Sequence, residues 1–444
     1  MSAPVSNLLD EFMILISSSR NLTKPRAELA RIQNRKIRNI VDYAYRKVHF
    51  YHRLLKDNGI QLGDIKSVKD LNRIPVITKE DLKRVNTSDL ISSDYRPEKL
   101  NTLKTGGSTG EPLSTYISDH ERNWRTAIYL RCNIKNGQRP WHSWASLDEA
   151  THLRKQRHGV RFFPHTSVPI VWSLSRQVEM LQALRPDVLD GLSSTLWLLA
   201  REVRDGRVAS IQPRIVFGTG ELISNSSRRL IEDVFGGGYY DQLSCTEVGR
   251  TAWECAEREG YHMNVDSCVM QFLGGEGEEV SQGERGEITY TSLHNYAMPI
   301  IRYCIHDVGI PMDDECPCGV TMPMMKMIEG RRNSFIVFPS GRIVSPWRLI
   351  EALNLFTLTD MIRQYKIIQE SRDLIEVRIV KTRQEVDEAK IHDFIKSNLE
   401  REFTQEDLDL SELELRITYV DSITRTSRGK LNVVSSKLHD IPIF

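Results

Sequence analysis

The stretch that decides the fold reads Ile215-Val216-Phe217-Gly218-Thr219-Gly220-Glu221, a short apolar run followed by two closely spaced glycines. Such a run predicts a buried β-strand, and the glycines predict a turn directly after it. Residues 287–291 also have strand character, whereas residues 176–184 have the spacing of an amphipathic helix. This mixture between about 100 and 330 predicts an α/β domain whose loops at strand ends bind ligands.

The pattern changes after about Arg332. Residues 374–380 alternate like a half-exposed strand, residues 386–399 follow near-helical spacing, and residues 413–420 alternate again. The pattern predicts a small α+β domain of about 110 residues, within the common size range of domains. We therefore predict an α/β fold with a large multi-layer N-terminal domain over 1–332 and a small C-terminal α+β domain over 333–444.

The composition of the 444-residue chain supports this organisation. It exceeds the usual size of a single core, and its 40% hydrophobic and 27% charged residues are typical of a globular protein. The net charge is only +1, with 60 basic and 59 acidic residues. Without a one-sign excess or a clustered basic face, we expect neither a nucleic-acid nor a membrane-surface partner.

The sequence also predicts a location in the cell. Its apolar runs are shorter than the ~20 residues that span a bilayer, and the N-terminal apolar stretch follows Asp10 and Glu11 without a basic start. We therefore expect a surface or packing helix there. Seven cysteines without an export signal are typical of a reducing compartment. We expect a cytoplasmic protein.

Two N-terminal segments have helical signals. Apolar positions between 32 and 55 follow helical spacing. After Pro75, Thr78 is placed to cap a helix start, with Asp81 three residues later to complete the cap.

The motif with the clearest chemistry is Thr105-Gly106-Gly107-Ser108-Thr109-Gly110-Glu111-Pro112. Three glycines let the backbone approach an anion closely, and the hydroxyl groups add hydrogen-bond donors. This chemistry suits a polyphosphate, although the loop lacks the Gly-Lys-Ser/Thr ending of a Walker loop. Taken alone, it is also compatible with an ordinary polar turn.

The loop resembles the phosphate loop of the adenylate-forming (acyl-CoA synthetase) superfamily. Upstream, Tyr43-Ala44-Tyr45 and the segment 71–79 (Leu-Asn-Arg-Ile-Pro-Val-Ile-Thr-Lys) resemble the entry region of its phenylacetate–CoA ligase-like branch. The chain is also similar to relatives of that branch that are associated with capsule biosynthesis. The resemblance covers residues from about 30 to about 435.

The resemblance implies an ATP- and Mg²⁺-dependent ligase that converts a small carboxylic acid into an acyl-adenylate. It further implies transfer to coenzyme A after the small domain rotates. An amine or a carrier-protein thiol would use the same first step, so this alternative stays open. A non-catalytic nucleotide-binding relative is a second alternative, and a homodimer is left open.

Further motifs follow in the order that the resemblance implies. Residues 243–247 (Leu-Ser-Cys-Thr-Glu) resemble the family's Tyr-Gly-x-Thr-Glu motif, in which Glu247 would hold Mg²⁺. The family's aromatic residue beside adenine aligns with Leu243, so either Tyr240 supplies the ring or aliphatic packing holds the base. The turn at Gly220 and Glu221 resembles the adenine-contacting turn.

The later motifs concern ribose and catalysis. Residues 299–307 resemble Pro-x-x-Arg-Tyr-x-x-x-Asp, whose final Asp307 would accept both ribose hydroxyls; an Arg302–Asp307 ion pair is the alternative. Gly330-Arg331-Arg332-Asn333 resembles the family's Gly-Arg-x-Asp hinge, and Arg331 would contact ribose or phosphate. Residues 425–430 resemble Arg-Thr-x-x-Gly-Lys, where Lys430 would offset charge on the α-phosphate.

The resemblance thus assigns three groups of site residues. The catalytic residues are Lys430, Glu247 and Arg331. The nucleotide-binding residues are Thr105, Gly106, Gly107, Ser108, Thr109, Gly110, Gly220, Glu221, Tyr240, Thr246 and Asp307. The acid pocket is placed between Trp141 and Ser194, with Trp172 either a wall of that pocket or a core residue.

Four residues have metal-ligand chemistry. Cys255, His262, Cys316 and Cys318 supply three thiolates and one imidazole, which complete a tetrahedral zinc shell. Their spacing is not the compact double Cys-x-x-Cys pattern. Some members of the resembled branch carry a similar set, which favours a structural zinc site; Cys268 is a spare candidate.

Overall fold

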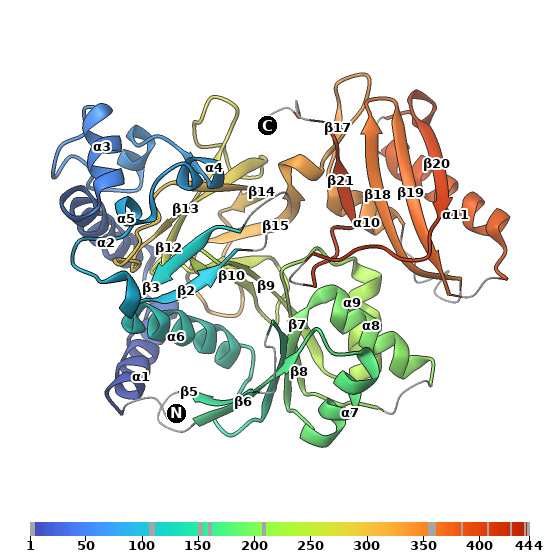
Figure 1. Cartoon of the computed structure of the whole chain (residues 1–444), viewed down its shortest axis with the longest axis horizontal. Helices are drawn as coiled ribbons and strands as arrows, with labels where there is room; N and C mark the ends of the chain where they lie inside the picture. Colours follow the sequence, from blue (N-terminus) through green and yellow to red (C-terminus); the bar gives the residue numbers. More distant parts are fainter. Residues whose placement is uncertain are drawn as a thin grey trace.

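The computed structural model describes residues 5–105, 112–149, 154–158, 162–206, 210–353, 361–382, 385–405, 408–426, 429–438 and 441. Most of the described chain before residue 332 is built on one sheet, and the part after it has a sheet of its own (Figure 1).

The large sheet has 13 strands in the order β12-β13-β14-β15-β11-β10-β9-β8-β7-β4-β6-β5, with β1 beside β14. Neighbours from β6 through β4, β7 and β8 to β9 run parallel, and those from β9 to β12 run antiparallel. Its strands are β1 (Ile77–Thr78), β4 (Trp144–Asp148), β5 (Arg154–His158), β6 (Phe162–Pro169), β7 (Val188–Leu192), β8 (Ile215–Thr219), β9 (Gly238–Cys245), β10 (Gly249–Glu254), β11 (Tyr261–Met263), β12 (Cys268–Leu273), β13 (Gly286–Ser292), β14 (Tyr303–Met312) and β15 (Met324–Arg331).

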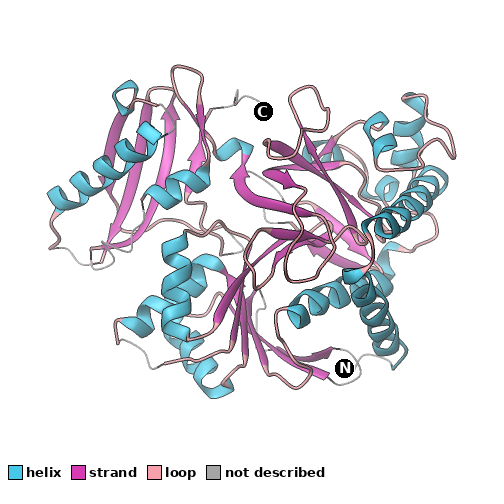
Figure 2. Cartoon of the chain, turned by 180° about the vertical axis from the view of Figure 1, so that it is seen from behind, coloured by secondary structure: helices cyan, strands magenta, loops and turns pink. Residues whose placement is uncertain are grey.

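Helices cover both faces of the parallel part (Figures 1 and 2). On one face, α7, α8 and α9 form an apolar cluster with the sheet, and on the other face α6 and α1 do so. A small hairpin of β2 and β3 stands apart from the large sheet. These elements are α1 (Val5–Ser19), β2 (Asn101–Lys104), β3 (Ser114–Ile117), α6 (Asp119–Lys135), α7 (Leu174–Leu184), α8 (Ser193–Arg204) and α9 (Asn225–Phe235).

The antiparallel part packs against the N-terminal helices in the largest apolar cluster. These helices are α2 (Arg26–Lys47), α3 (His49–Asp57), α4 (Lys79–Lys83) and α5 (Thr87–Leu90). The predicted helix over 32–55 is wrong in its continuity, because the extended backbone of Val48 (φ −124°, ψ 113°) separates α2 from α3. The predicted cap at Thr78 is confirmed: its Oγ1 accepts from Asp81 N, and Asp81 Oδ2 accepts from Thr78 N.

The C-terminal part has a 4-stranded sheet in the order β20-β19-β18-β21, an apolar cluster of its own, and a short hairpin of β16 and β17. Figure 2 shows helices along one side of this sheet. Its elements are β16 (Ile336–Val337), β17 (Ile343–Val344), α10 (Pro346–Ala352), β18 (Ile362–Ser371), β19 (Leu374–Lys381), α11 (Glu388–Gln405), β20 (Glu414–Tyr419) and β21 (Val434–Ser436). The α/β fold class with an α+β C-terminal part is confirmed.

The opening stretch forms β8 and the turn after it, as predicted. Gly218 is required there because a Cβ would lie 1.7 Å from the Tyr239 hydroxyl. Among the described residues, the helices are too short or too polar to cross a bilayer.

Candidate active site

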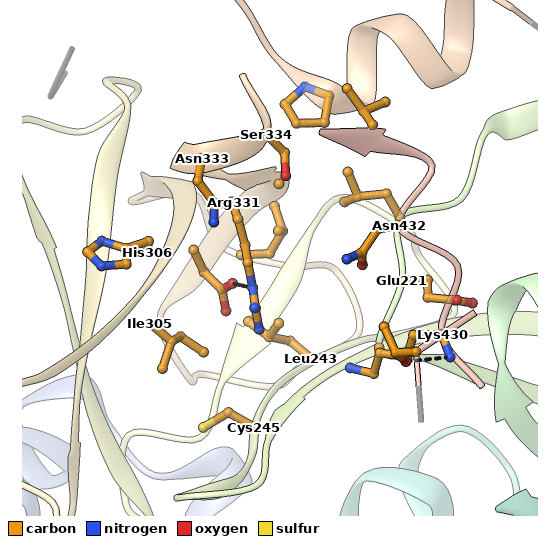
Figure 3. Close-up of a pocket in the computed structure, with 18 of the residues that line it drawn as sticks. Glu221, Leu243, Cys245, Ile305, His306, Arg331, Asn333, Ser334, Lys430 and Asn432 are labelled. Atoms are coloured by element: carbon orange, nitrogen blue, oxygen red, sulfur yellow. Dashed lines mark hydrogen bonds and ion pairs between the residues drawn. The ribbon is translucent and has the colours of Figure 1, made fainter. Parts of the chain in front are cut away.

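The two sheets enclose a cavity of about 440 Å³ (Figure 3). One side is formed by the ends of β9, β14 and β15, and the other by residues 430–436 of the C-terminal part. The sequence-predicted residues that line it are Thr105, Gly220, Glu221, Thr246, Glu247, Asp307, Arg331 and Lys430. The fold therefore brings together motifs that are up to 325 residues apart between Thr105 and Lys430.

Glu247 is a buried carboxylate at the floor of the cavity, 5% exposed. Its Oε1 accepts from the Tyr303 hydroxyl at 2.9 Å. Its carbonyl oxygen accepts from Arg125 Nη2 at 2.6 Å and from Asn295 Nδ2 at 2.8 Å. The position of this carboxylate is therefore fixed through both its backbone and its side chain.

The carboxylate of Asp307 lies in the middle of β14, with one oxygen directed to each of two neighbours. Oδ1 pairs with Arg331 Nε at 3.4 Å, and Oδ2 accepts from the Tyr290 hydroxyl at 3.3 Å. The alternative Arg302–Asp307 pair is wrong, because Arg302 donates to backbone carbonyls at Asn72 and Gly277 instead. Arg302 thus fixes the N-terminal segment to the sheet and leaves Asp307 in the cavity.

Lys430 reaches the cavity from the C-terminal part. A Cβ on Gly220 would lie 3.2 Å from Lys430 Nζ, and Gly220 has a left-handed φ of 79°. The amine therefore lies directly above the glycine turn that follows β8. The backbone of Lys430 is held in a tight turn with Thr426, whose Oγ1 accepts from Lys430 N at 3.1 Å.

Glu221 joins the two parts of the molecule. Its Oε2 accepts from Ser194 N at 2.9 Å on the large domain, and its Oε1 accepts from Leu431 N at 2.5 Å. Leu431 directly follows Lys430, so this one carboxylate anchors the segment that carries the lysine. The sequence motif gave Glu221 an adenine contact and contained no signal for this bridge.

Other predicted residues lie elsewhere or outside the described part. Tyr240 packs against Phe217, with ring centroids 6.0 Å apart, whereas Leu243 lines the cavity. Trp172 packs against the apolar cluster of α7, α8 and α9, and the guanidinium carbon of Arg176 lies 3.8 Å from the centre of its ring. This agrees with the prediction of a core residue rather than a pocket wall. The glycine-loop residues Gly106, Gly107, Ser108, Thr109 and Gly110 lie outside the described residues.

The base of the glycine loop is described. Thr105 N donates to Leu113 O at 2.8 Å, and Thr105 Oγ1 accepts from Leu113 N at 2.9 Å. These bonds continue the pairing of β2 with β3, so the loop connects two hydrogen-bonded strands. Thr105 itself lines the cavity, which sets the start of the loop at the site.

Sequence reasoning missed two residues that support the site. Tyr303 lies within the segment 299–307, but nothing in that motif assigned its hydroxyl to Glu247. Arg125 belongs to α6, where its position looked like an ordinary helical one, yet it donates to the carbonyls of both Thr246 and Glu247. Both residues act through tertiary contacts, which a motif does not encode.

The predicted hinge is also fixed to the large sheet. Arg332 Nε pairs with Glu287 Oε1 at 3.1 Å, and His306 Nδ1 lies 3.1 Å from the same oxygen. Hydrogen bonds with Cys304 and Glu287 raise the pKa of His306 to about 10. Asn333 follows and lines the cavity, so the chain passes beside the site as it leaves the large domain.

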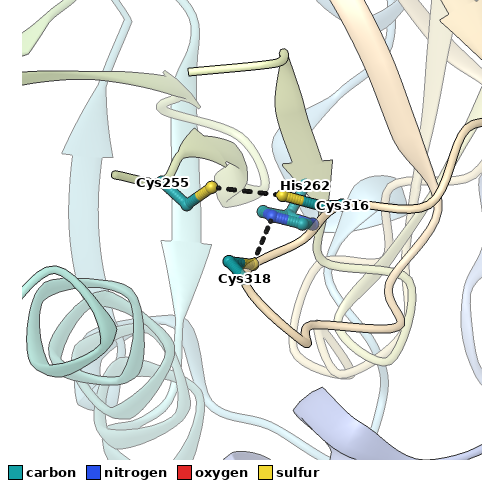
Figure 4. A group of neighbouring side chains, drawn as sticks. All are labelled: Cys255, His262, Cys316 and Cys318. Atoms are coloured by element: carbon teal, nitrogen blue, oxygen red, sulfur yellow. Dashed lines mark hydrogen bonds between the residues drawn. The ribbon is translucent and has the colours of Figure 1, made fainter. Parts of the chain in front are cut away.

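The four predicted metal ligands are brought together (Figure 4). Cys255 Sγ lies 3.5 Å from Cys316 Sγ, and Cys318 Sγ lies 3.3 Å from His262 Nε2. All four ligand atoms lie within 4.8 Å of one another. Zn–S bonds of about 2.3 Å place two sulfurs of a tetrahedral site about 3.8 Å apart, so the spacing is close to that of a zinc shell.

The surroundings of this cluster suit a bound cation. Burial raises the pKa of the Cys255 thiol to about 12 and lowers that of His262 to about 4. The imidazole is therefore neutral, as a metal ligand must be, and a dication would have to stabilise the thiolates. The cluster joins the loop between β14 and β15 to the β10–β11 hairpin. The spare candidate Cys268 is buried in β12 and is not part of the cluster.

Known proteins resemble the chain over most of its length. Residues 336–437 match a family model described as the CapK C-terminal domain. A phenylacetate-coenzyme A ligase of Thermus thermophilus is 26% identical over 356 residues, which cover 78% of this chain and 79% of the relative. Protein CapK of Staphylococcus aureus is 24% identical over 368 residues, covering 80% and 78%.

The fold is that of a solved ligase as well. A 2-hydroxyisobutyryl-CoA ligase in the postadenylation state, in complex with 2-HIB-AMP, matches with a TM-score of 0.78 and 20% identity, covering 94% of this chain and 91% of that one. The fold and these similarities define an AMP-forming acid–thiol ligase of the adenylate-forming superfamily. Within that superfamily, the chain is similar both to phenylacetate-coenzyme A ligases and to CapK.

The comparison also distinguishes between two domain arrangements. The same ligase in its thioesterification state matches with a TM-score of 0.64, against 0.78 for the postadenylation state at equal coverage of this chain. The overall fold of this chain is therefore closer to the postadenylation structure of that ligase than to its thioesterification structure.

Proposed function

We propose that this protein activates a small carboxylic acid with ATP and then transfers the acyl group to coenzyme A. The observation that carries the proposal is the meeting of Lys430, Glu247, Asp307 and Arg331 in one cavity. Adenylate formation requires a cation beside the α-phosphate, a carboxylate that can hold Mg²⁺, and an acceptor for the ribose hydroxyls. The similarity of the chain to phenylacetate-coenzyme A ligases supports the same reaction.

In the first step, a carboxylate oxygen of the acid attacks the α-phosphorus of ATP, and the bond to the β-phosphate oxygen breaks. Pyrophosphate leaves and the acyl-adenylate remains. Lys430 would lie beside the α-phosphate and stabilise its developing negative charge. The glycine loop that begins at Thr105 would hold the departing phosphates, whose orientation then favours in-line attack.

Asp307 would accept hydrogen bonds from the two ribose hydroxyls. Its carboxylate offers two oxygens, and its present partners Arg331 and Tyr290 orient it without enclosing it. Leu243 and Ile305 line the same cavity and would pack on adenine, in place of an aromatic ring. Tyr240 is directed to Phe217 and is not required by this arrangement.

Glu247 would hold Mg²⁺, since a buried carboxylate oxygen is the kind of ligand that this hard cation prefers. The bound cation would neutralise phosphate charge during transfer. Glu247 presents its carboxylate to the cavity, and among the described residues the Tyr303 hydroxyl is the side chain that donates a hydrogen bond to it. Tyr303 would therefore orient the carboxylate toward the phosphates.

We further propose that residues 1–332 and 333–444 move as two units. The two units have separate sheets and separate apolar clusters, and the chain crosses between them at Arg332 and Asn333. Rotation of the C-terminal unit would withdraw Lys430 and open a path for the thiol of coenzyme A. An amine or a carrier-protein thiol remains the alternative acceptor.

The Cys255, His262, Cys316 and Cys318 cluster is proposed to hold a structural zinc ion. Four protein ligands fill a tetrahedral shell and leave no position for substrate. Zinc would then stiffen the hairpin whose Tyr261 lines the cavity and donates to Asp241 Oδ2 at 2.7 Å.

The proposal is tested by acid-dependent exchange of pyrophosphate into ATP with a panel of carboxylic acids. Coenzyme A is then added, and thioester formation is followed by mass spectrometry. We expect exchange with at least one acid and a thioester with coenzyme A. Exchange without any thioester would favour the amine or carrier-protein alternative, and ATP binding without exchange would favour a non-catalytic protein.

A further inference from the structure

A buried charged cluster lies directly behind one wall of the cavity. It consists of Asp190 on β7, Arg250 on β10, Tyr129 on α6 and Ser244 on β9. Asp190 is 7% exposed and Arg250 is 5% exposed. Ser244 lines the cavity, so the cluster adjoins the place where the substrates of the proposed reaction meet.

The contacts of the cluster leave one donor unused. Arg250 Nε donates to Ser244 Oγ at 3.1 Å, and the guanidinium carbon lies 3.7 Å from the centre of the Tyr129 ring. The Tyr129 hydroxyl donates to Asp190 Oδ2. Arg250 Nη1 is buried and has no hydrogen-bond partner among the described residues.

A second buried arginine shows what a structural ion pair looks like in this protein. Arg131 donates from Nη1 to Asp266 Oδ2 at 2.7 Å and from Nη2 to Asp266 Oδ1 at 3.0 Å, and Asn264 and Ser18 satisfy further bonds. Among the described residues, no carboxylate accepts two hydrogen bonds from Arg250 in this way. A buried unsatisfied donor costs about 1–3 kcal/mol, more when it is charged, so its persistence calls for a partner.

The same imbalance affects Asp190. Burial raises the pKa of its carboxyl group to about 7, and the nearby Arg250 limits that rise. Burial lowers the pKa of Arg250 to about 10. The site therefore contains a cationic donor, Arg250, and a carboxyl group, Asp190, that do not form a hydrogen bond with each other in this structure.

The position of the cluster relative to Lys430 sets what could approach it. In the proposed reaction the carboxylate of the acid lies near Lys430 and Glu247, and both line the cavity together with Ser244. The acyl portion must extend away from the phosphates along the cavity wall. Ser244 is on that wall, and the Arg250 guanidinium lies behind it, on the face of the sheet that α6 covers.

We propose, on the basis of the proposed function, that the acid carries a hydroxyl group on its acyl portion, which accepts from Arg250 Nη1 and donates to Asp190. A hydroxyl fits better than a second carboxylate, because it is both acceptor and donor and adds no charge beside Asp190. An apolar acyl group would leave Arg250 Nη1 unpaired. The substrate class is thus a hydroxylated carboxylic acid, and Arg250 and Asp190 determine specificity.

The test uses pairs of acids that differ only by a hydroxyl group, such as phenylacetate with 4-hydroxyphenylacetate and butanoate with 4-hydroxybutanoate. Pyrophosphate exchange gives kcat/KM for each acid. For at least one pair we expect the hydroxylated acid to be favoured at least about tenfold, since sites that bond a hydroxyl reject analogues without it. Equal or better exchange with every unhydroxylated partner, or a dicarboxylate such as succinate as the best acid, would overturn the assignment.

Variants connect the preference to the cluster. Arg250→Met is expected to reduce the preference for the hydroxylated acid to about onefold, that is, to equal kcat/KM for the two members of a pair. Asp190→Asn keeps the shape of the side chain and should also reduce the preference for the hydroxylated acid. This second variant tests the same prediction if Arg250→Met does not fold. Arg258→Met, which removes a surface arginine that pairs with Glu232, is the matched control.

Failure of this inference and failure of the proposed function give different results in these measurements. If both Arg250→Met and Asp190→Asn lower exchange equally for the two members of a pair, the cluster is structural and the inference is wrong. If the wild-type protein binds ATP but exchanges with no acid at all, the proposed function itself fails, which is a different result from a preference for apolar acids.

Discussion

The two walls of the cavity differ in how they are held. The wall from the large sheet carries Glu247 and Asp307, which are buried and bonded to neighbours within the same sheet and its helices. The opposite wall carries Lys430 and is attached across the domains by contacts such as Glu221 to Leu431 and Arg201 to the carbonyls of Ile362 and Arg363. The difference implies that the proposed nucleotide-binding groups belong to the large sheet, whereas the proposed catalytic cation, Lys430, comes from the C-terminal part.

The comparison makes binding and catalysis separable. A change in the sheet wall should affect ATP binding or stability, and a change in the C-terminal wall should affect adenylation with little effect on ATP binding. In this structure Lys430 lies in the cavity, where the proposed first step would take place.

The largest effect is expected for Lys430→Ala. Adenylation should fall about 10²–10³-fold, the usual cost of removing one group that stabilises developing charge. ATP affinity should change less than about threefold, because the sheet wall is untouched. Pyrophosphate exchange and equilibrium ATP binding measure the two quantities, and Lys437→Ala, an exposed lysine of the same domain, is the control. Unchanged exchange would remove Lys430 from catalysis.

Loss of the proposed zinc ion should act on the sheet wall. Cys316→Ser, or a strong chelator, should lower the midpoint of thermal unfolding by several degrees, since metal binding contributes to folding free energy. Cys268→Ser, a buried cysteine outside the cluster, is the matched control. Metal analysis of the purified wild type should find about one zinc per chain, and a protein without zinc would refute the site.

Glu221→Gln should weaken the bridge between the walls. The carboxylate accepts from one backbone N–H on each side, and hydrogen bonds to a charged group are worth about 1.5–3 kcal/mol. Adenylation should fall about tenfold, and thioester formation from added acyl-adenylate should stay within about twofold. Glu351→Gln, at the exposed contact with Asn225, is the control for the interface. An equal fall in both half-reactions would contradict a role specific to this arrangement.

The smallest effect is expected for Tyr240→Leu. The ring packs on Phe217 rather than lining the cavity, so ATP affinity should change by less than about threefold. Leu243→Ala, which truncates a cavity-lining side chain, should weaken ATP binding more than Tyr240→Leu does. The reverse order, measured by ATP titration, would restore Tyr240 as the adenine contact.

The sequence predicted the parts of this structure that depend on local pattern. The strand and turn at 215–221, the cap at Thr78 and the C-terminal elements all follow from periodicity and capping chemistry. The break at Val48 was missed because apolar spacing continues across it. The motifs likewise identified most residues that line the cavity, since each motif keeps its own spacing.

The rest depends on which residues meet in space. Glu221 bonds to Leu431 across 210 residues, and Arg250 lies behind Ser244 with Asp190 from another strand nearby. Tyr240 lies on the face of β9 that packs against Phe217, whereas Leu243 lines the cavity. The division at 332 and 333, the roles of the site residues and a homodimer stay predictions.

The most direct test of the account is acid-dependent exchange of pyrophosphate into ATP, measured in parallel for the wild type and Lys430→Ala. The account predicts exchange that requires an acid and Mg²⁺ in the wild type, and its near-complete loss in the variant while ATP still binds. Wild-type protein that binds ATP and exchanges with no acid across a broad panel would contradict it.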